Sequence, residues 1–223
     1  MKLKNKIKKN WPRAVVLILL FTLLITVAGY QYFRPRKLAS DFTKSYEAYD
    51  SSETLFSEAV LNSIYSGNPV NVQYNKELLQ IAVETSNAGR VSLAKNALSI
   101  SQFWLRYLTL TGDIEKTARD NLTTLNLNAA MLGSAFSGKA LEIADDSEKE
   151  TDTIRSLKLA LRSRFTETSD FLTLMINNNG SFFNPPGAKN LSDEITRLSN
   201  TYDQLKEKRQ KDFAQFKGLT GMK

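Results

Sequence analysis

The apolar residues of this chain follow two different patterns. From Ala14 to Phe33 they occupy every side of an expected helix, and Gln31 is the only strongly polar residue in that stretch. From residue 38 onward the apolar residues recur every three or four positions, which is the spacing of amphipathic helices. No segment alternates apolar and polar residues in the manner of a strand, so we expect an all-α protein.

Breaker residues divide the amphipathic part into segments that are expected to form a helical bundle. The breaks are Gly67-Asn68-Pro69, Thr111-Gly112, the acidic stretch 145–150 and a loop over 177–189. Ser147 and Glu150 have the spacing of a capping box at a helix start. The stretch 86–90 indicates either a turn or a loosened helix. We therefore expect an up-and-down bundle of four to five helices, over 38–64, 79–111, 113–143, 147–175 and 190–212.

The last of these helices carries a heptad pattern. Its seam positions are Leu191, Ile195, Leu198, Tyr202, Leu205, Arg209 and Asp212. Because the last two are charged, the apolar seam is expected to fade toward the C-terminus. In the segment 113–143, Ala130, Ser134 and Gly138 place small residues four positions apart, which allows a neighbouring helix to pack closely.

The continuous apolar segment has the length of a transmembrane helix. At about 1.5 Å per residue, residues 14–33 span roughly 30 Å, the thickness of the hydrocarbon core of a bilayer. Aromatic residues stand at both ends, where they favour the interface between lipid and water. Basic residues adjoin them. The expected residues of the membrane interface are Trp11, Arg13, Tyr30, Tyr32, Arg34, Arg36 and Lys37.

The distribution of positive charge predicts how the chain is oriented. Residues 1–13 carry six basic residues and no acid, whereas residues 34–37 carry three. The larger basic flank stays in the cytoplasm by the positive-inside rule. We therefore expect a short cytoplasmic tail (1–13), a signal-anchor helix (14–33), a basic juxtamembrane linker (34–37) and an extracytoplasmic bundle (38–223) in a single-pass protein of the cell membrane. A cleaved signal peptide is the alternative interpretation.

The composition excludes several classes of function. The chain has 30 Lys and Arg residues against 23 Asp and Glu residues, but outside the two basic flanks it has 21 against 23, a net charge of −2. The bundle therefore lacks the clustered positive charge of a nucleic-acid-binding protein. The chain has no His and no Cys. These zeros exclude a His-based triad, a cysteine nucleophile, a disulfide and a zinc site of imidazole or thiolate ligands.

Three motifs have the residue types of a chemical site, and each also has a structural interpretation. Ser92 and Lys95 form an S-x-x-K match, without the partner motifs of the enzymes that use it. The carboxylates over 145–152 could hold Ca²⁺, or could stabilise the start of a helix. Phe103, Trp104 and Tyr107 crowd one helical turn, which is typical of a core cluster. We expect no enzyme activity, no cofactor and no metal.

Phe182 and Phe183 are the best candidates for a contact with a partner. They lie side by side in the loop from Gly180 to Gly187, which also contains Pro185 and Pro186. Two adjacent phenylalanines in so short a loop favour either a contact with a partner or a plug at the end of the bundle.

These observations predict a non-enzymatic interaction or scaffold module of the cell envelope. Its partners would be the lipid bilayer and either a protein of the envelope or a second copy of the chain, with no nucleic acid. The alternative is a ligand-binding or sensory ectodomain that works with a separate signalling partner.

Overall fold

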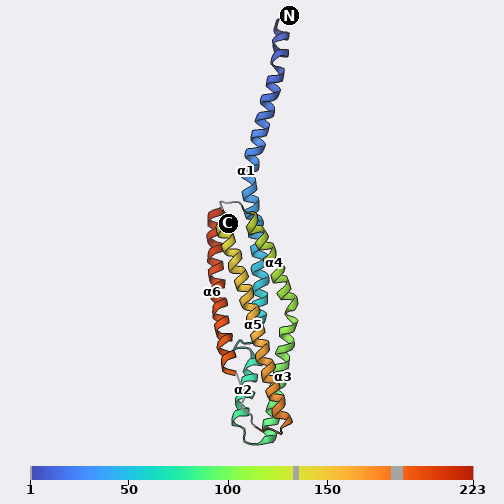
Figure 1. Cartoon of the computed structure of the whole chain (residues 1–223), viewed down its shortest axis with the longest axis vertical. Coiled ribbons are helices and arrows are strands. Elements are labelled where there is room, and N and C mark those ends of the chain that lie inside the picture. Colours follow the sequence, from blue (N-terminus) through green and yellow to red (C-terminus); the bar gives the residue numbers. More distant parts are fainter. Residues whose placement is uncertain (1, 133–135, 182–187, 223) are drawn as a thin grey trace.

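The computed structural model describes residues 2–132, 136–181 and 188–222, and it confirms an all-helical protein within them (Figure 1). In helices, the side chains of residues 2–18, 28–33, 137 and 188–192 lie outside the described part. Six helices occupy the described ranges, one or two more than the sequence predicts for the bundle. They are α1 (Lys2–Leu61), α2 (Pro69–Val83), α3 (Asn87–Leu110), α4 (Gly112–Met131), α5 (Ser137–Asn177) and α6 (Ala188–Thr220).

The helices form four long rods that run alternately in opposite directions (Figure 1). The first rod is α1 followed by α2, the second is α3 followed by α4, and α5 and α6 are the third and fourth. Near the N-terminal end of the bundle, α1, α4, α5 and α6 pack around one core. At the far end α3 packs on α5, and α2 packs on α3. The N-terminal half of α1 projects beyond the other helices.

The stretch 86–90 is a true helix start rather than a loosened helix. Helix α2 ends at Val83, and the Ser86 side chain caps α3 by accepting a hydrogen bond of 3.1 Å from the backbone N–H of Gly89. Asn68 caps α2 in the same way, through the N–H of Val70 at 2.9 Å. A polar side chain at this position satisfies an N–H group that has no partner within its helix. Of the two interpretations of 86–90, the structure therefore supports a break, and the segment 79–111 is divided between α2 and α3.

The chain also reverses where the sequence predicts a continuous helix over 113–143. Helix α4 ends at Met131 and α5 begins at Ser137. The apolar spacing persists across the reversal because Leu132 and Ala140 face the same core from its two sides. A turn between two helices that share a core can thus keep the period of a single helix.

The acidic stretch 145–150 does not interrupt the helix, contrary to the prediction. Helix α5 continues through it for 41 residues. Ser147 and Glu150, which the sequence predicts as a capping box, are both buried with no exposed surface, and the Ser147 hydroxyl donates to the Ile143 carbonyl within the same helix. The acidic residues are tolerated in mid-helix because most have basic partners: Lys149 pairs with Asp145 one turn away, and Lys208 of α6 pairs with Asp146.

The seam of α6 does not fade where the sequence predicts. Arg209 and Asp212 are buried, and Phe213 and Phe216 continue the seam beyond them. The buried apolar residues form two clusters, one at each end of the bundle. Arg209 lies between the two clusters because its charge is met by acidic residues of α1 and α5.

A tight contact closes the far end of the bundle, and it gives a testable prediction. Gly180 has a φ of +81°, and a Cβ atom there would lie 2.5 Å from the carbonyl oxygen of Asn87. Gly180→Ala should therefore lower the free energy of unfolding by about 1–3 kcal/mol, measured by chemical denaturation. Gly138→Ala is the control, since nothing lies within 4 Å of a Cβ atom at this helical position. The control should be neutral or stabilising; equal losses in both variants would contradict the prediction.

Candidate functional site

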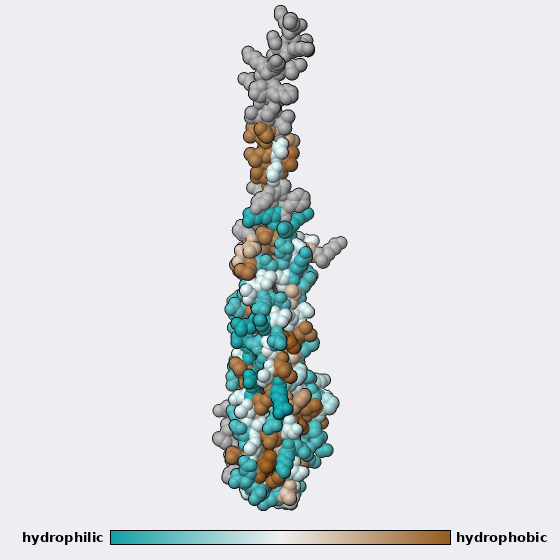
Figure 2. All heavy atoms as spheres, turned by 90° about the vertical axis from the view of Figure 1, so that its right-hand side faces the viewer, coloured by the Kyte–Doolittle hydropathy of each residue, from teal (hydrophilic) through white to brown (hydrophobic). Residues whose placement is uncertain are grey.

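An apolar belt surrounds the projecting part of α1. The large apolar side chains among residues 19–27 are between 46% and 67% exposed; they are Leu19, Leu20, Phe21, Leu23, Leu24, Ile25 and Val27. Successive residues of a helix point in different directions, so these side chains cover the whole circumference. Figure 2 shows the belt as an apolar band between atoms that lie outside the described part. No other described helix packs on it (Figure 1).

The residues predicted at the membrane interface divide into two groups. The side chains of Trp11, Arg13, Tyr30 and Tyr32 lie outside the described residues. Arg34, Arg36 and Lys37 are exposed on α1 between the apolar belt and the bundle. Over the described residues alone, no helix has an 18-residue window that is apolar enough to count as a membrane span.

The remaining motifs of the sequence analysis are the predicted partner contact, the carboxylates over 145–152 and the S-x-x-K match. Phe182 and Phe183 lie outside the described residues. Among the residues that the structure does describe, no three carboxylates come together as a metal site would require. The carboxylates over 145–152 instead face basic side chains or solvent. Ser92 and Lys95 both lie exposed on the surface of α3.

A buried charged layer separates the two apolar clusters, and Arg209 of α6 is its centre. The guanidinium is fully buried and makes a two-pronged contact with Glu150 of α5, through Nε to Oε2 and through Nη2 to Oε1 at 3.2 Å. On the α1 side, Nη1 lies 2.8 Å from Asp50 Oδ1 and donates to the Tyr46 hydroxyl at 2.7 Å. Three helices are therefore joined through one side chain.

Aromatic rings and a second carboxylate complete the layer. Arg209 Cζ lies 5.2 Å from the ring centres of both Tyr46 and Tyr49, a distance at which a cation is attracted to the ring face. Tyr49 donates to the Ser147 carbonyl at 2.8 Å. Glu53 is fully buried and makes longer ion pairs, 3.8 Å to Arg209 and 3.6 Å to Lys206. The layer thus holds more acidic than basic side chains. The carboxylates are Asp50, Glu53 and Glu150, and the cations are Lys206 and Arg209.

This imbalance perturbs the acid–base properties of the layer. Burial, assisted by the neighbouring carboxylate of Glu53, raises the pKa of Glu150 from 4.5 to about 8, although the contact with Arg209 acts in the opposite direction. Burial also raises the pKa of Tyr49 far above its ordinary value. The folded state therefore binds a proton on Glu150 more tightly than the unfolded state does.

The aromatic cluster of α3 is divided between the core and the surface. Trp104 is buried, and its ring centre lies 5.0 Å from that of Phe103 and 5.3 Å from that of Tyr107. Phe103 is 48% exposed. Trp104 is thus a core residue, as the structural interpretation of this cluster predicts, whereas Tyr107 reaches the rim of a groove.

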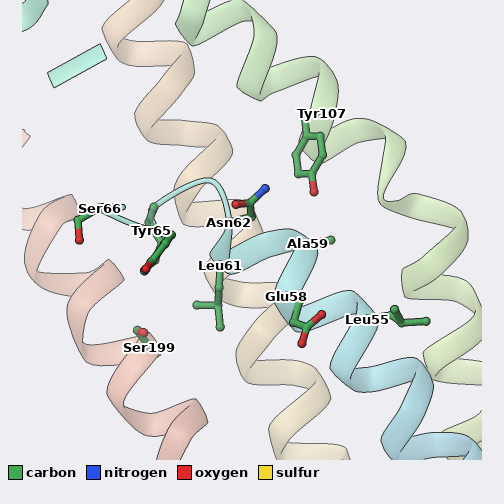
Figure 3. Close-up of a pocket in the computed structure, with 10 residues that line it drawn as sticks. Leu55, Glu58, Ala59, Leu61, Asn62, Tyr65, Ser66, Tyr107 and Ser199 are labelled. Atoms are coloured by element: carbon green, nitrogen blue, oxygen red, sulfur yellow. The ribbon is translucent and has the colours of Figure 1, made fainter. Parts of the chain in front are cut away.

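The groove has a volume of about 850 Å³ and crosses the end of α1. Figure 3 shows Tyr107 above the last turn of α1 and Ser199 of α6 on the opposite side. Its floor and walls come mainly from α1 and the residues that follow it, and Leu55 and Tyr65 are 57% and 64% exposed. Among the described residues that line the groove, Glu58 is the single ionisable group besides the two tyrosines. The groove therefore offers an apolar contact surface rather than a set of converging catalytic groups.

Sequence reasoning missed the charged layer, although a signal for it exists. Arg209 occupies the same heptad position as Tyr202 and Phe216, seven residues to either side, and both are buried. A charged residue at a position that is otherwise buried predicts an acidic partner on a facing helix. That partner is Glu150. Its spacing from Ser147 led the sequence analysis to a capping box instead.

Comparison of the chain with protein-family models, curated proteins and solved structures finds no match.

Proposed function

We propose that this protein is a single-pass membrane protein whose helical bundle acts outside the cytoplasm as a non-enzymatic contact or scaffold module. The main support for this proposal is the apolar belt of α1. Seven large apolar side chains exposed on all sides of one helix are unfavourable in water, at roughly 25 cal/mol for each Å² of apolar surface. A bilayer removes that cost, and the basic residues on both sides of the belt suit the two membrane surfaces.

The continuity of α1 supports the same proposal. The helix runs without interruption from Lys2 to Leu61, through Pro35. Its second half packs in the bundle, where Ala39 and Phe42 are buried. The anchor and the bundle therefore share one helix, and the bundle begins close to the membrane surface.

Replacing Leu20 and Leu24 by Arg tests the anchor. Two charges at the centre of the span cost about 2.5–3.5 kcal/mol each on insertion, so the variant should leave the membrane fraction under an alkaline wash that retains the wild-type chain. The control is Leu110→Arg with Val83→Arg, at positions 78% and 77% exposed on the bundle. It should stay with the membrane. Release of the wild-type chain, or of the control variant, would contradict the anchor.

Photo-crosslinking in intact cells tests the contact role. A photoreactive amino acid at Tyr65, in the groove, should give one reproducible adduct with a protein or with a second copy of the chain. The control site is Leu159 on α5, which is 62% exposed against 64% for Tyr65 and lies outside the groove. Identical products at both sites, or none at Tyr65, would remove the groove as the contact surface.

A further inference from the structure

The end of the bundle from which α1 projects carries exposed apolar side chains on α4. Leu127 is 56% exposed and Met131, one helical turn later, is 59% exposed. Phe136, at the start of α5, is half-buried against the apolar cluster of this end. We call Leu127, Met131 and Phe136 the α4 end patch. Figure 2 shows apolar side chains near this end of the bundle, below the projecting helix.

The helix ends beside this patch are capped by apolar residues. Phe136 stands at the N-cap of α5, which has no side-chain cap hydrogen bond. Leu132 stands at the C-cap of α4, where its backbone N–H donates to the Ala129 carbonyl. At the other turns α2 and α3 are capped by the side chains of Asn68 and Ser86. A helix N-terminus that faces water ordinarily uses such a polar cap, so the apolar N-cap of α5 suits a less polar environment.

Contacts between α1 and α4 fix how far the patch lies from the apolar belt. The Asn128 side chain donates to the Asp41 carbonyl at 3.3 Å, so Asn128 and Asp41 stand at one level. Met131 is three residues further along α4, which runs opposite to α1 and so reaches roughly the level of Leu38. Leu38 lies five residues beyond Phe33, or about 7.5 Å along the helix. The headgroup region of one leaflet is about 5–8 Å thick.

The charge at this end matches an anionic surface. The lysines of the bundle end are neutralised by neighbouring acids. Lys139 pairs with Asp212. Lys217 pairs with Glu47. Arg34, Arg36 and Lys37 add three basic residues between the apolar belt and the patch. Basic residues that flank exposed apolar side chains are typical of surfaces that lie in the headgroup region.

We infer that the α4 end patch is a second contact with the bilayer, seated among the headgroups of the leaflet next to the bundle. This inference rests on the proposed membrane anchor. It adds that the bundle leans on the bilayer along α4 and does not stand free at the end of α1. Leu219 of α6 stands at nearly the same level on the other side of the bundle, since Phe216 packs on Phe42 of α1. A bundle that leans along α4 lifts Leu219 away from the bilayer.

The absence of native cysteine makes a direct test possible. Single variants Leu23→Cys, Met131→Cys, Leu219→Cys and Val83→Cys of the full chain are labelled with one environment-sensitive fluorophore. The labelled chains are then reconstituted in vesicles of phosphatidylcholine and phosphatidylglycerol. Vesicles that contain lipid with a nitroxide on the headgroup, or midway along the acyl chain, report the depth of each label. Leu219 is the matched control, because it is 65% exposed against 59% for Met131.

The headgroup nitroxide should quench the label at position 131 several times more strongly than the labels at 219 and 83. The acyl-chain nitroxide should quench the label at position 23. If position 23 is quenched and position 131 behaves like 219, the second contact is overturned while the anchor stands. If position 23 is not quenched, the anchor itself fails, and the second contact fails with it.

Discussion

Replacing Arg209 by Met should lower the free energy of unfolding of the full chain in detergent micelles by about 3–5 kcal/mol. The substitution leaves the carboxyl groups of Glu150 and Glu53 buried without the guanidinium that contacts both. It also leaves the Tyr46 hydroxyl without its donor. Chemical denaturation followed by circular dichroism measures the loss.

Two further variants separate the effect of burial from that of charge removal. Lys211→Met changes an exposed cation two residues along α6 and should alter the free energy of unfolding by less than about 0.5 kcal/mol. Arg209→Met combined with Glu150→Met should recover much of the loss, since replacing both members of a buried ion pair is far less costly than removing one. A loss below about 1 kcal/mol for Arg209→Met would show that the layer does not hold the helices together.

The protein should become less stable as the pH rises from about 5 to about 8. Glu150 has a pKa near 8 in the folded chain against 4.5 ordinarily, so in this range the folded state holds a proton that the unfolded state releases. Unfolding is therefore favoured by rising pH, by up to about 1.4 kcal/mol for each pH unit. The charged groups that act on Glu150 are Glu53 on α1, which raises its pKa, and Arg209 on α6, which lowers it.

Denaturation curves over this pH range measure the effect, and Glu150→Gln should remove most of the slope. Asp145→Asn is the control on the same helix: Asp145 is 63% exposed and pairs with Lys149 at the surface. It should leave the slope unchanged. Equal stability of the wild-type chain at both ends of the range would contradict the raised pKa of Glu150.

Much of the fold could be predicted because periodicity reports which side of a helix is buried. The pattern from residue 38 onward correctly indicates an all-helical protein. It does not locate the reversal between Leu132 and Phe136, because both residues belong to helices that face one core and the spacing does not change. It does not choose between a turn and a helix at Ser86 either, since that choice depends on a hydrogen bond to Gly89.

The charged layer escaped prediction for a different physical reason. Hydropathy assigns Arg209 and Glu150 to the surface, and each is buried only because the other is there. The two residues stand 59 positions apart on different helices. Periodicity describes one helix at a time and so does not reveal the pair. The groove at the end of α1 likewise depends on Tyr107 and Ser199, which lie on other helices.

The single buried cation also determines the axial register of the bundle. Ile195, Tyr202, Arg209 and Phe216 repeat every seven residues along α6, and all are buried. Sliding α6 by one heptad, about 10 Å, would keep the helical face but would move Arg209 to the level of Tyr202 or Phe216. There the guanidinium would meet an apolar cluster and the carboxylates would lose it. A purely apolar seam would tolerate such a slip, so this layer selects one alignment of the rods among several of similar packing.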